Sequence, residues 1–421
     1  MEAGPTELVT RLAYQLAIIL FAAKLGGEIF ERILKQPPVL GELLAGVAIG
    51  PFALGGLDLG GLGPLFLHAV PSGGEGFSIP VSPELWAFAQ VAAIVLLFSA
   101  GLETDLVQFL RFAGPAALVA VGGVIIPFVL GVAATVAFGI SGGFLSPEAL
   151  FMGAIMAPTS VGITARVLAD IKRLDAPEGV TILAAGVLDD VLAILALTFV
   201  AGISVAGSIS VVHLLAVGGK ALGFWVALMV IGILLSRYIS RMLIAFRVSG
   251  ARVSLAMALA FLFSGLAESF GLAMIIGAYT IGLALSHTEL ARSLARPVAA
   301  VYQVMVPIFF VVMGMLVDIP AIGGVLVFGI VFSVLGILGK VLGSGLPALG
   351  VGFNRTGAGR IGIGMLPRGE VALIIAGAGL ARGIIGVDLF GVSIMMTFVT
   401  TLLAPIIMVP LFGREASGRR A

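Results

Sequence analysis

The chain has 421 residues, of which 60% are hydrophobic and 11% are charged. Soluble domains carry about 25% charged residues, so this composition excludes an ordinary soluble protein and places most of the chain in a membrane. A net charge of +1 without any basic run gives no sign of a nucleic-acid partner, and the absence of cysteine excludes disulfides, thiolate catalysis and cysteine-based metal sites.

Apolar segments follow one another along the whole chain. A membrane-spanning helix needs about 17–25 mostly apolar residues. The sequence predicts thirteen such spans, at about 7–33, 37–55, 84–102, 113–139, 147–170, 179–204, 211–236, 251–269, 272–286, 298–317, 322–350, 360–381 and 390–412. The expected fold class is therefore an all-α polytopic membrane protein, with residues 1–421 forming a single membrane unit and no separate soluble domain.

Basic residues between the expected spans are confined almost entirely to one side of the membrane. That side carries Lys172 and Arg173 together with most of the other basic loop residues, whereas the opposite side has only Arg11 and Arg382. Basic loops stay in the cytoplasm, so we expect the N-terminus outside and the C-terminus in the cytoplasm of an integral protein of the cell membrane. The long outer loop at about 57–83 has no role that the sequence indicates.

Two of the expected spans contain helix-breaking residues. Pro158 lies near the middle of 147–170 and Pro367 lies in the first half of 360–381, each beside glycine and polar side chains. Proline removes a backbone donor and clashes with the preceding turn, and opened backbone in lipid is tolerated only where it is buried in protein or lines a wet cavity. The breaks lie seven spans apart, so the two helices run in opposite directions. This predicts an inverted repeat with a site at two discontinuous crossing helices; the alternative is a pair of ordinary proline kinks.

The span at 179–204 carries two adjacent acids, Asp189 and Asp190, at a depth where a charge costs about 2.5–3.5 kcal/mol by insertion scales. Consecutive residues on a helix point about 100° apart, so the two carboxylates cannot share one partner equally. We expect Asp189 to face Lys340, which lies within the span 322–350, and Asp190 to face a cavity beside the breaks. The alternative is a static buried salt bridge that only fixes helix packing.

Paired carboxylates at this depth suit the exchange of two cations. Because such close carboxylates repel, at least one is expected to hold a proton at rest. A carboxylate that binds either a proton or a metal cation is the minimum device for exchange, and Asp190, which we expect to face the cavity, is the candidate cation ligand. Hydroxyl and carbonyl oxygens also suit hard cations, and Thr159 and Ser160 supply them at the first break.

Other charges in the spans have expected structural roles. Arg368 and Glu370, beside Pro367, are expected to neutralise each other or to cap the broken helix ends, with a part in the ion path or the pH response as the alternative. Glu42 is expected to serve packing or an interface. Lys24 and a glutamate four residues later are expected to pair.

Six motifs, found in this order over almost the whole length, resemble those of monovalent cation/proton antiporters of the second large family, most of all the NapA-type sodium/proton antiporters. The matching stretches are Pro38-Val-Leu-Gly-Glu-Leu-Leu-Ala-Gly, Gly101-Leu-Glu-Thr, Thr159-Ser-Val-Gly-Ile-Thr-Ala-Arg-Val-Leu, Leu188-Asp-Asp-Val-Leu, Gly336-Ile-Leu-Gly-Lys-Val-Leu-Gly and Pro367-Arg-Gly-Glu-Val. The resemblance implies a thirteen-helix NhaA/NapA-like fold that forms a homodimer. A core of helices at about 113–204 and 322–412 would move against a dimerisation scaffold at about 7–102 and 211–317.

The same resemblance implies roles for the acid pair. Asp190 would be the main ion- and proton-binding carboxylate, and Asp189 would pair with Lys340. An Asp-Asp pair is associated with electrogenic exchange of two protons per sodium ion. The implied partners are a monovalent cation, protons and the lipid bilayer; no cofactor is expected, and the protein is not expected to be an enzyme.

Other functions on similar residues were weighed against this one. An intramembrane aspartyl protease would need its two acids on different helices facing one scissile bond, and a passive channel would not couple two ion fluxes. A potassium/proton antiporter would use the same hard oxygen ligands. A solute symporter on the same inverted-repeat plan is the remaining alternative, but it would not retain a buried lysine beside paired acids.

Overall fold

The computed structural model describes residues 5–57, 64–66, 80–206, 211–270, 272–318, 326–413 and 418–419. Helices make up nearly all of this part of the chain. The first of them are α1 (Pro5–Ile29), the π-helical turn η1 (Phe30–Leu34), α2 (Pro38–Ile49), the 3-10 turn η2 (Leu54–Gly56), α3 (Pro83–Glu103), α4 (Leu106–Ala137), α5 (Pro147–Met156), α6 (Val161–Asp170), α7 (Pro177–Ala206) and α8 (Val211–Ala245). The others are α9 (Ala251–Ser269), α10 (Met274–Ser286), α11 (Glu289–Met315), α13 (Leu326–Gly350), α14 (Arg355–Gly364), α15 (Glu370–Ala381) and α16 (Val387–Phe412).

Eleven segments of the described chain are long and apolar enough to cross a membrane, and α10 and part of α15 are shorter apolar helices. The prediction of an all-helical polytopic membrane protein is therefore confirmed. The segment 147–170 is divided into α5 and α6, and the segment 360–381 is divided between α14 and α15. Both divisions fall at the prolines that the sequence singled out.

Two helices begin well before the residues expected from hydropathy. The span expected from 113 begins at Leu106, because Asp105 caps it by accepting a hydrogen bond from the backbone N–H of Gln108 at 2.9 Å. The span expected from 298 begins at Glu289, since Pro297 lies inside α11 without ending it. Hydropathy marks the apolar part of a helix, whereas these two extend beyond it.

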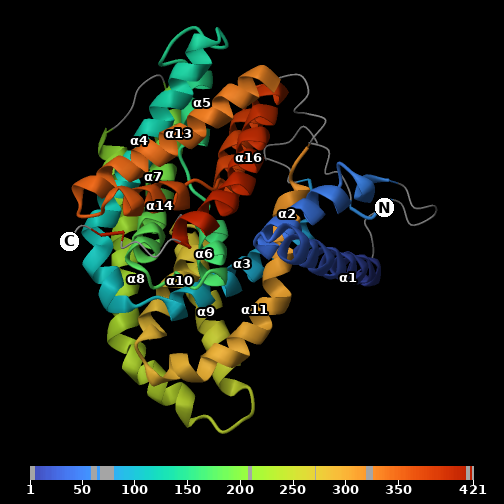
Figure 1. The fold of residues 1–421 in the computed structure, drawn as a ribbon, viewed down its shortest axis with the longest axis vertical. Helices are drawn as coiled ribbons and strands as arrows, with labels where there is room; N and C mark the ends of the chain where they lie inside the picture. Colours follow the sequence, from blue (N-terminus) through green and yellow to red (C-terminus); the bar gives the residue numbers. More distant parts are fainter. Residues whose placement is uncertain are drawn as a thin grey trace.

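Close helix pairs bring distant parts of the chain together. In Figure 1, α4, α5, α13 and α16 gather in the upper part of the view, while α9, α11 and α1 lie below them. Within the upper group α4 packs against α13, where a Cβ on Gly122 would lie 2.2 Å from the backbone oxygen of Gly343. Elsewhere α2 packs against α11, where a Cβ on Gly46 would lie 2.0 Å from the oxygen of Val311. Small residues allow this close approach of membrane helices.

Candidate ion-binding site at the helix breaks

The two interrupted helices meet at their breaks and exchange hydrogen bonds. The backbone N–H of Ser160 donates to the oxygen of Pro367 at 2.8 Å. The hydroxyl of Thr159 donates to the oxygen of Met365 at 3.0 Å, and the hydroxyl of Thr164 donates to the oxygen of Gly364 at 2.6 Å. Each opened segment therefore supplies partners for the other, which is what interrupted backbone needs at membrane depth.

Lys340 lies beside this crossing, and each of its three ammonium donors has a partner. Its Nζ is 2.7 Å from Asp189 Oδ1, 2.7 Å from the oxygen of Ala157 and 2.8 Å from the oxygen of Gly123. The second carboxylate oxygen of Asp189 accepts from the backbone N–H of Thr159 at 2.6 Å. Both side chains of the ion pair are 0% exposed. The structure thus brings Asp189 and Lys340 together and joins them to the first break.

Arg368 is also fully buried, and its guanidinium lies at the broken end of α5. Nη1 donates to the oxygens of Ala157 at 3.1 Å and Pro158 at 2.6 Å, and Nη2 reaches the oxygen of Gly336 at 3.5 Å. A cation at the C-terminal end of a helix is favoured by the helix dipole. This is the capping position considered from the sequence. The side chain of Glu370, the other residue expected there, lies outside the described residues.

Asp190 points to a different part of the molecule from Asp189. It is 4% exposed and lines a cavity of about 10 Å³ together with residues of α3, α6, α7 and α10, including Val161 directly after Ser160. Within the described residues no three His, Cys, Asp or Glu side chains form a metal-binding group. A cation at Asp190 would therefore need hydroxyl and carbonyl oxygens as well. The hydroxyl of Ser160 is buried and has no hydrogen-bond partner in the described chain.

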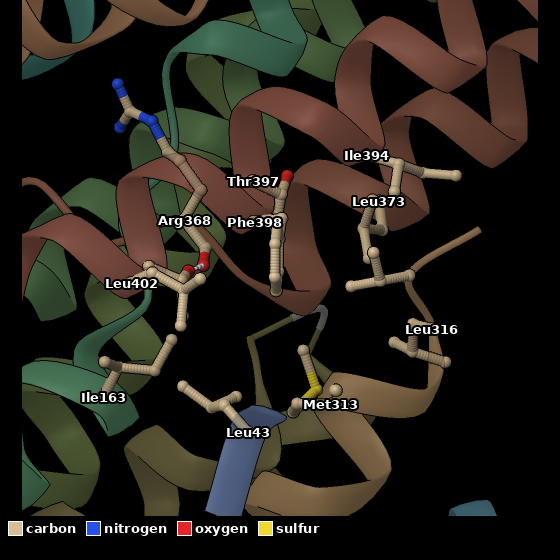
Figure 2. Close-up of a pocket in the computed structure, with 13 residues that line it drawn as sticks. Leu43, Ile163, Met313, Leu316, Arg368, Leu373, Ile394, Thr397, Phe398 and Leu402 are labelled. Carbon is tan, nitrogen blue, oxygen red and sulfur yellow. Dashed lines mark hydrogen bonds between the residues drawn. The ribbon is translucent and has the colours of Figure 1, made fainter. Parts of the chain in front are cut away.

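A second cavity, of about 20 Å³, adjoins the same crossing. Figure 2 shows Ile163 of α6, Leu373 of α15 and Phe398 of α16 on one side of it, facing Leu43 of α2 and Met313 of α11. Arg368 lines this cavity with its backbone, while its guanidinium points away from the other labelled residues. The wall of this cavity is mostly apolar, and the cavity lies between α2 and α11 on one side and α6, α15 and α16 on the other.

Sequence reasoning did not find the ion pair between Glu42 and Arg166. Arg166 Nη2 is 3.6 Å from Glu42 Oε1, its Nε is 3.0 Å from Asp170 Oδ2, and its guanidinium carbon lies 5.1 Å above the ring of Tyr302. Glu42 is 2% exposed and Arg166 is 8% exposed. Glu42 was the one residue in the sequence that could have indicated this pair, because a carboxylate in an apolar span needs a partner of opposite charge at the same depth.

The expected pair of Lys24 with Glu28 does not form. Glu28 instead lies 2.9 Å from Arg32, which is also four residues away but on its other side, and Lys24 Nζ donates to the oxygen of Gln303 at 3.1 Å. A further buried pair joins α7 to α14, where Arg360 Nη1 is 2.7 Å from Glu178 Oε1.

The described part of the outer loop is fastened to α1. Arg11 Nε donates to the oxygen of Leu65 at 3.3 Å, Gln15 Nε2 donates to the same oxygen at 3.0 Å, and the side chain of Phe66 is buried. The remaining residues of this loop, 58–63 and 67–79, lie outside the described chain. Arg11, which the sequence identified as one of two basic residues on its side of the membrane, is thus a loop anchor.

Comparisons with known proteins identify the family. A model of the transmembrane sodium/hydrogen exchanger family matches residues 17–414. The chain is 34% identical to the Na(+)/H(+)-K(+) antiporter GerN of Bacillus cereus over 97% of this chain and 98% of GerN. It is 35% identical to the high-affinity Na(+)/H(+) antiporter NhaS3 of Synechocystis over 93% of this chain and 87% of NhaS3. The solved structure of the sodium proton antiporter MjNhaP1 from Methanocaldococcus jannaschii shares the fold, with a TM-score of 0.65 and 20% identity over 97% of this chain and 100% of that one. The chain belongs to the sodium/hydrogen exchanger family.

Proposed function

We propose that this protein is a secondary active antiporter of the cell membrane that exchanges sodium for protons, with Asp190 as the carboxylate that binds both. The observation that carries the proposal is the division of the acid pair. Asp189 is held at the crossing by Lys340 and by the backbone of Thr159, whereas Asp190 lines a separate small cavity. The relatives named above are described as sodium/proton antiporters, which supports sodium and protons as the two exchanged ions.

Alternation between two ligands at Asp190 would couple the two fluxes. An unpaired charge in a dry interior costs several kcal/mol, so the site crosses the membrane only with sodium or a proton bound. Oxygens of Thr159 and Ser160, together with freed carbonyls at the break, complete a shell for sodium. Loss of the Asp189–Lys340 contact during the cycle would release a second proton and make exchange electrogenic. The membrane potential then contributes about 2.3 kcal/mol per charge per 100 mV.

The same proposal includes the architecture. Thirteen spans in an inverted repeat would place helices at about 113–204 and 322–412 in a moving core, and those at about 7–102 and 211–317 in a scaffold that dimerises. The apolar cavity of Figure 2 lies along this boundary and supports it. The N-terminus lies outside and the C-terminus in the cytoplasm, which is supported by the bias of basic residues between the helices.

Reconstitution into liposomes tests the function directly. With a pH-sensitive dye inside the vesicles, addition of sodium outside is expected to drive protons out at a rate that rises with sodium and saturates. An imposed potential should change that rate if exchange is electrogenic. Vesicles without protein provide the control. A sodium flux that proceeds without any opposing proton flux would contradict antiport and favour a channel.

Potassium is a second candidate substrate, because the name of GerN includes potassium beside sodium. The oxygen donors at the break suit either ion. A series of lithium, sodium and potassium chlorides in the same liposomes decides between them. We expect sodium to give the lowest apparent KM; proton movement with potassium alone would replace sodium in the proposal.

A further inference from the structure

Two of the described side chains in the wall of the cavity beside Asp190 are polar. They are Asp190 itself and Tyr279 of α10, and the other five lining residues are apolar. Its volume of about 10 Å³ is close to the ~10–15 Å³ that one water molecule needs. An ion or water molecule in this cavity therefore lies beside both Asp190 and Tyr279.

A much larger polar cavity, of about 350 Å³, opens where α3 turns into α4. We call it the vestibule. Its wall includes Thr104, Glu103, Asp105, Asp175 and His287. Asp175 belongs to the same connection as Lys172 and Arg173, so the vestibule faces the side of the membrane with the basic loops, which the proposed topology makes cytoplasmic. Its acids would raise the local concentration of cations there.

One hydrogen bond joins the wall of the vestibule to the wall of the cavity beside Asp190. Tyr279 Oη donates to Thr104 Oγ1 at 3.4 Å, and Thr104 Oγ1 donates in turn to the oxygen of Ala100 at 2.7 Å. Tyr279 and Thr104 are each 1% exposed. Thr104 lines the vestibule and Tyr279 lines the cavity, so this contact lies between the two. We call these two side chains the partition.

The partition is held in place by tight helix packing. A Cβ on Gly101 of α3 would lie 2.4 Å from the backbone oxygen of Tyr279, and a Cβ on Gly282 would lie 2.5 Å from the oxygen of Phe98. The ring of Phe109 packs against that of Tyr279 with their centroids 5.9 Å apart. Because the backbones of α3 and α10 are in direct contact, the helices cannot approach further or slide easily, and the partition opens by rotation of the Tyr279 side chain.

We propose that Tyr279 is the gate between the vestibule and Asp190, and that Thr104 is a positioning residue that holds it closed. When the hydroxyl of Tyr279 leaves Thr104, the ring turns aside and the phenol oxygen becomes a ligand for a passing cation or water. The gate rests on the proposed function, since it takes Asp190 as the ion-binding carboxylate. It adds a residue on α10 to the ion path, outside the interrupted helices and their lysine.

Cysteine accessibility tests the gate, because the chain contains no cysteine of its own. Ile276→Cys places one thiol in the wall of the Asp190 cavity, and a charged, membrane-impermeant thiol reagent is added on the vestibule side. Tyr279→Phe and Thr104→Val should each raise the labelling rate about fivefold, the factor expected from the net loss of one hydrogen bond. Tyr279→Ala should raise it further, because the ring is removed as well. Labelling from the opposite side should stay at the parent rate.

Thr280→Val provides the matched control. Thr280 is the next residue on α10 and is also buried and hydrogen-bonded, since it accepts from Trp225 Nε1 at 3.1 Å, but it lines neither cavity. In the Thr280→Val variant, the cysteine at position 276 should label at the parent rate. Unchanged labelling in Tyr279→Phe and Thr104→Val would overturn the gate even if Tyr279→Ala fails to fold. Equal increases from both sides would also overturn it, because they would indicate general loosening.

The labelling rate does not depend on transport, so failure of the gate and failure of the proposed function can be told apart. If Asp190→Asn stops exchange but Tyr279 and Thr104 variants label at the parent rate, only the gate is wrong. If those variants label faster while Asp190→Asn still exchanges ions, the partition exists but does not gate the ion-binding carboxylate, and the gate as proposed is overturned together with the assignment of Asp190.

Discussion

Replacing Asp190 with asparagine is expected to stop cation-dependent proton exchange while the protein still folds. Asparagine has nearly the same shape, but it carries no charge and cannot take up a proton in the working pH range. Removing one partner of a buried ionic contact costs about 3–5 kcal/mol, which corresponds to a loss of cation affinity of more than about a hundredfold. The carboxylate is 4% exposed, so bulk water cannot replace it as the ligand.

The measurement is the sodium-driven change of internal pH in liposomes containing equal amounts of variant and parent protein. Glu28→Gln is a suitable control, since the Glu28 side chain is 56% exposed and pairs with Arg32, far from the helix breaks. It should exchange at close to the parent rate. Saturable exchange by the Asp190→Asn protein would remove Asp190 from the role proposed for it.

Replacing Lys340 with alanine is expected to lower the thermal stability strongly. The ammonium makes three short contacts, one with a carboxylate that is itself 0% exposed. Its removal leaves the carboxylate of Asp189 without its counter-charge and takes one donor from the oxygens of Ala157 and Gly123. Breaking a buried pair in this way costs about 3–5 kcal/mol. Thermal unfolding of the purified protein should show a clear fall in Tm.

A double variant separates the ion pair from simple packing. The double variant carries Asp189→Asn and Lys340→Gln, so neither residue of the pair keeps an uncompensated charge. The stability that it loses should be smaller than the sum of the losses in the Asp189→Asn and Lys340→Gln single variants. The charge moved per sodium ion should also change in both single variants, which a purely structural pair would not require. Parent-like Tm and parent-like stoichiometry in Lys340→Ala would contradict the proposal for this residue.

Much of the site could be predicted because prolines and charged residues carry a high free-energy cost inside membrane-spanning helices. Pro158 and Pro367 must interrupt their helices, and the chain does divide close to both. A lysine and an acid pair inside apolar spans must find partners, and Lys340 does meet Asp189. The helical angle between neighbours then turns Asp190 towards other helices. In each case one physical rule narrows the possible break positions or charge partners to a few residues.

The sequence did not predict contacts between residues of types that are common in membrane helices. A tyrosine in an apolar helix is common, and the motif that ends at Thr104 does not indicate a partner for it, so the sequence did not link Tyr279 to Thr104. Glu28 has a basic residue four positions away on each side, and spacing alone does not choose between them. The pair of Glu42 and Arg166 depends on which helices are neighbours, which hydropathy does not encode.

The hydrogen bonds at the crossing also constrain how the protein is made. The Thr159–Met365 bond joins residues 206 positions apart, and the contact of Lys340 with Asp189 spans 151 positions. The ribosome therefore delivers the first interrupted helix to the membrane long before the segment that satisfies it. During that interval the opened backbone of residues 157–160 lacks its final partners, and the insertion machinery or water must cover it. Completion of the ion site is thus a late event in biogenesis, tied to the arrival of α14 and α15.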